Sequence, residues 1–183
     1  NGSDNNDGSI DNPFSSIQFA YDRADEHDTI LVHPGVYNDD IWFYGKNVVL
    51  GSLYLSTGDT SFISSTIIDG DSTDCTIAIY GNIDSTCRIT GFTIQNGIGC
   101  VYGQGAGIYV ESASPRLDNL IIKNNISGTN GGGICLNGNS NSLIDKVLIK
   151  NNSADMGGGL YSFNSNPIIT NSIIQYNHAN NGA

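Results

Sequence analysis

The sequence predicts an all-β solenoid in which three short parallel strands form each coil of about 26 residues. Two observations carry this prediction. First, the run Gly105-Ala106-Gly107-Ile108-Tyr109 recurs at positions 131–135 and again at positions 157–161, so the interval between copies is constant. Second, each repeat contains three apolar runs of about three to five residues, separated by Gly, Asn and Ser. Runs of this length are too short for helices and alternate with the period of a strand.

A second phase of the repeat supports the same coil. Residues 117–125 match residues 144–152 and 169–177, and a weaker copy covers residues 89–97. Equivalent apolar residues should form inward columns, because parallel coils stack strand upon strand. We expect one column of Ile79, Ile108, Ile134 and Leu160, and another of Ile68, Ile94, Ile122, Ile149 and Ile174. Asn125, Asn152 and Asn177 should form a hydrogen-bonded ladder at one turn, where Asn tolerates left-handed backbone.

The chain is interpreted as one domain, with a cap region over residues 1–28 and coils over residues 29–183. Pro13 lies near the start of a segment, residues 12–24, whose apolar residues have helical spacing. We therefore expect one short capping helix there. A further repeat begins at Gly182-Ala183, so we expect that end either to continue into more coils or to be covered by a partner.

Composition excludes several functions. The net charge of −11 with only 7 Lys and Arg argues against nucleic-acid binding and disfavours bare acidic polysaccharides, unless calcium bridges them to carboxylates. Apolar runs are too short for a membrane span. The four cysteines lack the C-x-x-C spacing of a structural zinc site, so such a site is not expected.

Several segments resemble a known group. The opening Gly2-Ser3-Asp4, the segment 28–37 (DTILVHPGVY) and the segment 91–97 (GFTIQNG) are similar to right-handed parallel β-helix proteins of the pectate-lyase-like superfamily, of the secreted or cell-surface type. The resemblance covers essentially the whole chain and implies a right-handed solenoid outside the cell. It does not specify an activity, because this superfamily includes lyases, hydrolases, epimerases and adhesins.

Lyases similar to this group use a Lys or Arg base beside calcium-binding carboxylates. The corresponding motifs are absent here, but the residue types occur in candidates that we expect to be mostly solvated charges. These are Arg88, Arg116, Lys123 and Lys150 as bases, with Asp118 and Asp145 pointing outward on neighbouring strands. A calcium-dependent polysaccharide lyase, or another carbohydrate-active enzyme, is therefore the alternative function.

Two acidic segments offer oxygen ligands for calcium. Asp4, Asp7 and Asp11 lie in the Asn-rich opening, which does not have the EF-hand spacing. Asp69, Asp71 and Asp74 lie within a Gly-Asp-Ser turn. Asx-rich turns explain both segments without a metal, and for the second segment catalysis is a further, weaker reading.

The most suggestive surface feature is a predicted outward column of Tyr80, Tyr109, Cys135 and Tyr161, with Glu111 and Phe163 beside it. Aromatic faces on a rigid sheet can stack on sugar rings or bury against a protein, although a covering loop would explain them equally well. The leading hypothesis is an extracellular module that binds glycan or a protein partner, or acts as a rigid element. End-to-end self-association is a third hypothesis.

Overall fold

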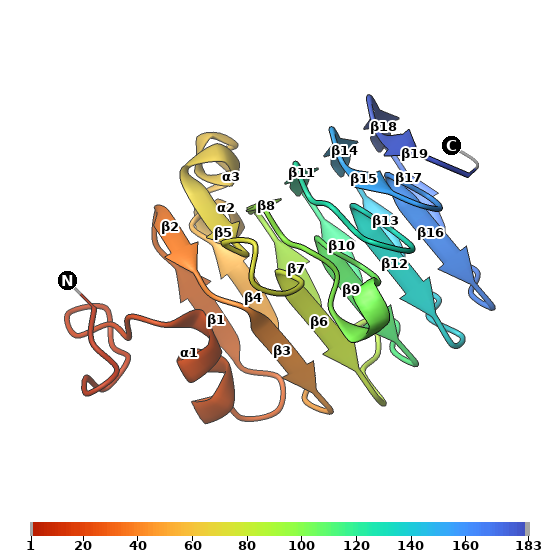
Figure 1. Cartoon of the computed structure of the whole chain (residues 1–183). Coiled ribbons are helices and arrows are strands. Elements are labelled where there is room, and N and C mark those ends of the chain that lie inside the picture. Colours follow the sequence, from red (N-terminus) through yellow and green to blue (C-terminus); the bar gives the residue numbers. More distant parts are fainter. Residues whose placement is uncertain (1, 182–183) are drawn as a thin grey trace.

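The computed structural model describes residues 2–181 and shows a stack of coils whose strands form three parallel sheets (Figure 1). Successive strands enter the three sheets in turn, so neighbours within a sheet come from successive coils. All pairings between these strands are parallel. The predicted solenoid with three strands per coil is confirmed.

The first two sheets contain six strands each. Sheet A consists of β1 (Thr29–Val32), β4 (Val49–Ser52), β7 (Arg88–Thr90), β10 (Arg116–Asp118), β13 (Leu143–Asp145) and β17 (Ile168–Thr170). Sheet B consists of β2 (Gly35–Asn38), β5 (Thr66–Asp69), β8 (Thr93–Gln95), β11 (Ile121–Lys123), β14 (Leu148–Lys150) and β18 (Ile173–Gln175).

The third large sheet, sheet C, has five strands. They are β3 (Ile41–Tyr44), β6 (Ile77–Tyr80), β9 (Ile108–Glu111), β12 (Ile134–Asn137) and β16 (Leu160–Phe163). A small extra pair joins β15 (Ser153–Ala154) to β19 (His178–Ala179). The outer face of sheet C carries six aromatic side chains: Trp42, Tyr44, Tyr80, Tyr109, Tyr161 and Phe163.

The strand register shows which predicted columns are correct. The column from Ile68 through Ile94, Ile122 and Ile149 to Ile174 is confirmed pair by pair. The other column is confirmed for Ile108, Ile134 and Leu160. Its first member was wrong, because Ile77 pairs with Ile108 whereas Ile79 pairs with Val110. The coil from Ile77 to Ile108 is longer than the coil that follows it, and the extra residues obscured the alignment.

The asparagine ladder is also confirmed. The side chains of Asn125 and Asn152 are buried, and the Asn125 Nδ2 and backbone N donate to Asn152 Oδ1. Asn152 donates in the same way to Asn177. The left-handed backbone expected at these residues instead lies one position earlier, at Asn124, Asn151 and Tyr176. The preceding residue therefore makes the turn, and the ladder residue points inward.

Replacing Asn152 with alanine should lower the free energy of unfolding by about 2–3 kcal/mol. The change removes the acceptor for two Asn125 donors and the donor to the Ile122 carbonyl, all inside the coil. Urea unfolding measures the effect. Asn166→Ala, at an exposed position, is the control and should change the stability by less than about 0.5 kcal/mol. Equal effects in both variants would contradict a stabilising ladder.

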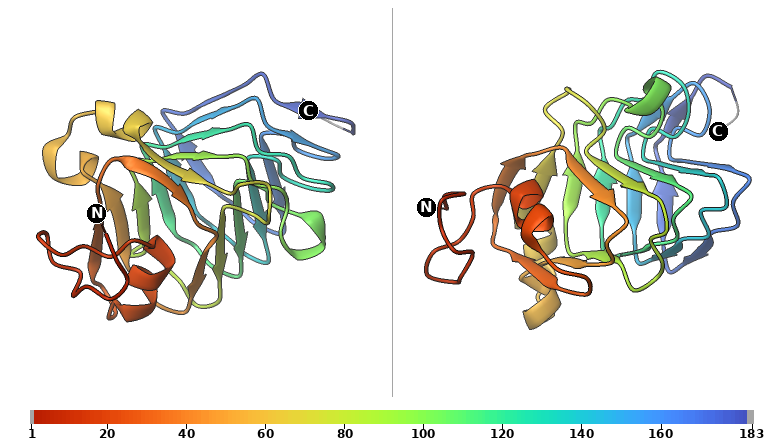
Figure 2. Two further views of the ribbon diagram at one scale, coloured as in Figure 1. Left: turned by 60° about the vertical axis from the view of Figure 1, so that its left-hand side comes forward. Right: turned by 90° about the horizontal axis from the view of Figure 1, so that it is seen from below.

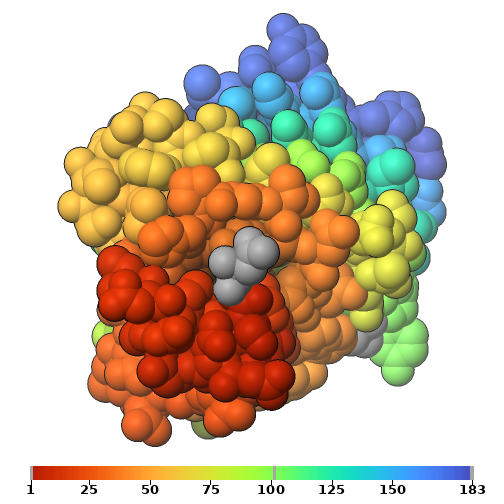
Figure 3. Space-filling model, turned by 90° about the vertical axis from the view of Figure 1, so that its left-hand side faces the viewer, coloured from red at the N-terminus to blue at the C-terminus, as the bar shows by residue number. Residues whose placement is uncertain are grey.

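The N-terminal segment covers the end of the first coil (Figure 3). Its helix α1 (Ile17–Arg23) is shorter than predicted and begins after Ser16, whose hydroxyl accepts from Phe19 N. Asp39, just before β3, accepts hydrogen bonds from the backbone N of Ile17 and Gln18. Ile17 and Tyr21 are buried against the core. Pro13 precedes the helix, so the capping helix is confirmed with a later start.

Two insertions project from the coils at different corners (Figure 2). One carries the short helices α2 (Tyr54–Thr57) and α3 (Ser61–Ser65), which pack on β4 and β5. The other contains the 3-10 turn η1 (Val101–Gly103) between β8 and β9. Both insertions lengthen early coils, which explains why the repeat is clearest in the C-terminal half of the chain.

At the other end, the inward residues Ile169 and Ile174 of the last described coil are exposed. The repeat predicted to begin at Gly182-Ala183 lies outside the described residues. Within residues 2–181, every helix is too short or too polar to cross a membrane, as expected.

Candidate binding face on sheet C

The outer face of sheet C carries two columns of side chains rather than the single column predicted. Strand register places Tyr109 beside Ala78 and Cys135, with Tyr161 next to Cys135. Tyr80 instead pairs with Glu111, and that column ends at Phe163. The predicted placement of Tyr80 beside Tyr109 was therefore out of register. Glu111 and Phe163 lie on the same face as the tyrosines, one alternation further along each strand.

The predicted exposure also needs correction. Tyr109 is only 3% exposed, because it packs with Cys75, Cys135 and Cys100 in a cluster beneath the loop that contains η1. Tyr80 and Tyr161 are half-buried, whereas Phe163 is exposed. The covering-loop interpretation therefore holds in the middle of the face, and open aromatic surface remains on both sides of the loop.

On the N-terminal side of the loop, three aromatic rings stack. The ring centroid of Tyr80 lies 5.8 Å from that of Trp42 and 5.4 Å from that of Tyr44, and the ring planes are nearly parallel. Tyr44 is well exposed. Trp42 and Tyr44 were not predicted at this face, although residues 41–44 (IWFY) and residues 77–80 (IAIY) both begin with Ile and end with Tyr. The long coil between Ile41 and Ile77, which includes the helical insertion, hid this repeat.

On the C-terminal side of the loop lies an open groove of about 420 Å³. Its lining combines two aromatic rings with amides and one carboxylate: Gln104, Glu111, Asn130, Asn137, Gly138, Tyr161, Phe163 and Asn164. The Oδ1 atom of Asn130 is buried and accepts no hydrogen bond within residues 2–181.

The floor of the groove is held by a chain of polar contacts. Asn137 Nδ2 donates to Gln104 Oε1 over 2.8 Å and to the Tyr109 hydroxyl over 3.2 Å. The Tyr109 hydroxyl in turn donates to Glu111 over 3.1 Å. Burial raises the pKa of Tyr109, so this hydroxyl keeps its proton and its donor role at neutral pH. The side chains of Gln104, Asn137 and Glu111 are thus held in place before any ligand arrives.

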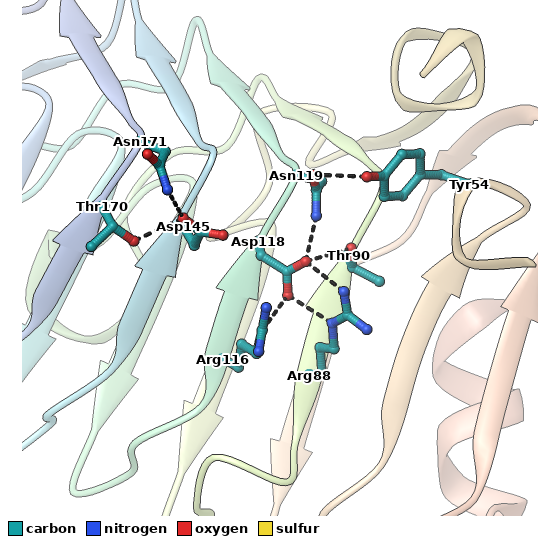
Figure 4. A network of polar contacts seen from close by, with 9 residues as sticks. All are labelled: Tyr54, Arg88, Thr90, Arg116, Asp118, Asn119, Asp145, Thr170 and Asn171. Atoms are coloured by element: carbon teal, nitrogen blue, oxygen red, sulfur yellow. Dashed lines mark hydrogen bonds and ion pairs between the residues drawn. The ribbon is translucent and has the colours of Figure 1, made fainter. Parts of the chain in front are cut away.

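The catalytic candidate Asp118 has a different role. Asp118 lies on the outer face of sheet A, where it alternates with the inward Leu117, but its side chain is fully buried. Arg88 donates to both of its carboxylate oxygens at 2.7 Å (Figure 4). Arg116 and Thr90 donate to it as well. Burial acts to raise the pKa of Asp118, but these hydrogen bonds and the charge of Arg88 outweigh it and lower the pKa. A paired, ionised carboxylate of this kind stabilises the coil and is a poor proton donor.

The other catalytic candidates do not gather into one site. Asp145 is the register equivalent of Asp118 in the next coil and accepts from Thr170 and Asn171. Lys123 and Lys150 occupy neighbouring register positions on sheet B, whereas both aspartates lie on sheet A. Arg116 forms an ion pair with Asp118. The arrangement of bases beside free carboxylates, which an enzyme of this kind would need, is not seen among residues 2–181.

The acidic segments behave mainly as turns. Asp4 accepts from the backbone N of Ser15 and Ser16, and Asp7 accepts from Ser9 N. Asp7, unlike Asp11, lines a second cavity of about 790 Å³ between the N-terminal segment and the first coil.

In the second acidic segment, Asp69 accepts from the side chains of Gln95 and Asn96, and its Oδ1 accepts from Asp71 N. Within residues 2–181, the grouping of potential metal ligands that comes closest together includes Asp74 but neither Asp69 nor Asp71. Its other members are two cysteines. The structure therefore brings none of the predicted acidic triplets together as a calcium site.

The geometry defines a protein class: a parallel β-solenoid with a capped N-terminal end and a polar, aromatic groove on one sheet. Residues 50–183 match the family described as right handed beta helix region, and the chain belongs to that family. The right-handed coil that the resemblance implied is thereby confirmed. No curated protein and no solved structure matches the chain.

Proposed function

We propose that this solenoid is a noncatalytic binding module, displayed outside the cell, that holds a neutral polysaccharide in the groove between Gln104 and Phe163. The observation that carries the proposal is the lining of that groove. Two aromatic side chains, Tyr161 and Phe163, flank amide groups and a carboxylate that are already oriented by hydrogen bonds. The family itself supports only a rigid structural or binding module.

Sugar rings fit this combination of groups. Their C–H faces stack on aromatic rings, and their hydroxyls both donate and accept hydrogen bonds. Asn137 and Asn164 offer such partners in the groove lining. Because the strands beneath the groove are locked into a stacked sheet, binding costs little ordering of the protein.

Charge favours a neutral ligand over an acidic one. The chain carries a net charge of −11, and Glu111 lies within the groove lining. A uronate polymer would meet repulsion there, which salt would only partly screen. Neutral hexose polymers meet no such penalty.

Tyr161→Ala and Phe163→Ala should each weaken polysaccharide binding roughly tenfold, because each removes about 1.5 kcal/mol of aromatic contact. A glycan array followed by calorimetry on a neutral oligosaccharide measures the change. Tyr176→Ala is the matched control, since Tyr176 is an exposed tyrosine outside the groove lining. It should bind as the wild type does.

Three outcomes would count against the proposal. Binding that is unchanged in both groove variants would place the ligand elsewhere. Absence of any bound glycan would favour the rigid or self-associating role. Cleavage of the polysaccharide, assayed on the same preparation with and without calcium, would establish the carbohydrate-active enzyme instead.

A further inference from the structure

The loop between β8 and β9 brings together two cysteines that are nearly one coil apart along the chain. Cys75 lies just before β6 and is fully buried, whereas Cys100 lies in the inserted loop and is partly buried. Ile98 N donates to the Asp74 carbonyl over 2.8 Å, which fixes the start of the loop against the residue before Cys75. The sulfur atoms of the two cysteines lie within 4.8 Å of one another.

A carboxylate completes the cluster. One oxygen of Asp74 and the sulfur atoms of Cys75 and Cys100 all lie within 4.8 Å of one another. Two thiolates around a tetrahedral zinc ion, with Zn–S bonds of about 2.3 Å, are separated by about 3.8 Å. The three atoms therefore need only small side-chain movements to share one ion. Asp74 Oδ1 also accepts from Cys75 N, which orients the carboxylate toward the pair.

The surroundings favour a cation at this position. The carboxylate of Asp40 lies close enough to feel the negative charge of Asp74, and its Oδ1 atom is buried without a hydrogen bond within residues 2–181. The hydroxyl of Tyr80 is also buried, and it has no nitrogen or oxygen hydrogen-bond partner among residues 2–181. Asp40 thus adds negative charge near Asp74, and Tyr80 packs in the same cluster as Cys75 and Cys100.

We propose that Asp74, Cys75 and Cys100 bind one zinc ion, which tethers the inserted loop to sheet C. Two thiolates and a carboxylate are a donor set that suits Zn²⁺ better than Ca²⁺ or Mg²⁺, which prefer oxygen ligands alone. Three protein ligands leave a fourth position, which a water molecule fills. The spacing of the cysteines concealed the site, because nearly a full turn of the solenoid separates Cys75 from Cys100 along the chain.

The tether has a structural consequence that is separate from glycan binding. Cys100 N donates to the Gln104 carbonyl, and Gly103 N donates to the Cys100 carbonyl, so these bonds close the inserted turn at Cys100. An ion at Cys100 would hold this turn over Tyr109 and Cys135. Zinc would therefore stabilise the fold even in a variant whose groove no longer binds sugar.

The test uses the full chain, stripped of metal with a chelator and kept reduced with a phosphine. Titration with Co²⁺ should show thiolate-to-cobalt charge-transfer absorption that saturates at one ion per chain, and one equivalent of Zn²⁺ should abolish it. Cys100→Ser should weaken zinc binding by more than about 100-fold, and Asp74→Asn by about 10- to 100-fold. Zinc should raise the Tm of the wild type and leave that of Cys100→Ser unchanged.

Cys87→Ala is the matched control, because Cys87 is equally buried but lies in the separate core cluster. It should bind both ions as the wild type does. Equal binding by Cys100→Ser and the wild type would overturn the proposal, as would absence of binding to the reduced chain. A mass lower by two hydrogens that persists after growth in zinc would show a disulfide between Cys75 and Cys100, and would overturn it too.

Discussion

Replacing Gly132 with alanine should lower the free energy of unfolding by about 4 kcal/mol or more, the largest effect that we expect from a single methyl group. An added Cβ atom would overlap the backbone carbonyl oxygens of Ser153 and Gly158 in the next coil. These atoms cannot turn away as a side chain would. Gly158 O accepts from Gly133 N, so separating the coils also breaks the ladder between them.

Gly128→Ala is the control for this prediction. Gly128 is exposed, has no atom within 4 Å of an added Cβ, and does not need a positive φ. Its replacement should be neutral or slightly stabilising, because alanine restricts the unfolded chain. Chemical denaturation followed by circular dichroism compares the two variants. A Gly132→Ala protein as stable as Gly128→Ala would show that the coils are packed less closely than described.

Replacing Asp118 with alanine should cost about 3 kcal/mol of stability. The change leaves Arg88 and Arg116 without their carboxylate and removes an acceptor for the buried hydroxyl of Thr90. The Arg88 and Arg116 side chains are 30% and 39% exposed, so water can partly replace the lost partner. The loss of stability is therefore expected near the lower end of the range of about 3–5 kcal/mol that is typical when one partner of a buried ion pair is removed. Urea unfolding provides the measurement.

Asp145→Ala is the matched control, because Asp145 occupies the same register position one coil later but lies near the surface. It should cost less than about 1 kcal/mol. Equal costs at the two positions would contradict the special role of the Asp118 network.

The same network should make stability depend on pH in the acid range. The pKa of Asp118 is lowered in the folded state, so its contribution is present above the unfolded value of about 3.9. That contribution is lost as the pH falls through the folded pKa, because protonation then weakens the bonds to Arg88 and Arg116. Unfolding of Asp118→Asn should therefore vary less between about pH 5 and 2 than unfolding of the wild type. Parallel curves for the two proteins would contradict this assignment.

The repeated half of the fold was predictable because its coils keep a nearly constant length. Ile94, Ile122 and Ile149 fell into one column from spacing alone, and so did the buried Asn125 and Asn152. Tyr80 was assigned to the wrong column because the coil that follows it is longer than the later coils, so residue spacing does not give its neighbour. The backbone pairing shows that Tyr80 lies beside Glu111.

Burial and contacts across insertions were harder to predict. Strand alternation places Asp118 on the outer face of its sheet. It gives no information about the burial of Asp118, which depends on Arg88 and Arg116 contacting it. Its neighbour Asn119 also accepts a hydrogen bond from the hydroxyl of Tyr54, which belongs to the helical insertion much earlier in the chain. The contact between Cys75 and Cys100 likewise depends on the path of an irregular loop. A repeat pattern contains no information about such a path.

The uniform coils described above also bear on how such a chain changes length over evolutionary time. Ile108, Ile134 and Leu160 stand in one column at equal steps along the chain. Unequal recombination between the gene segments that encode two such steps would add or remove one whole coil in frame. The strands of each coil pair only with the strands of the coil before and the coil after it, so the new junction would repeat pairings that already exist. The number of coils is therefore a heritable quantity that can vary while the N-terminal cap remains unaltered.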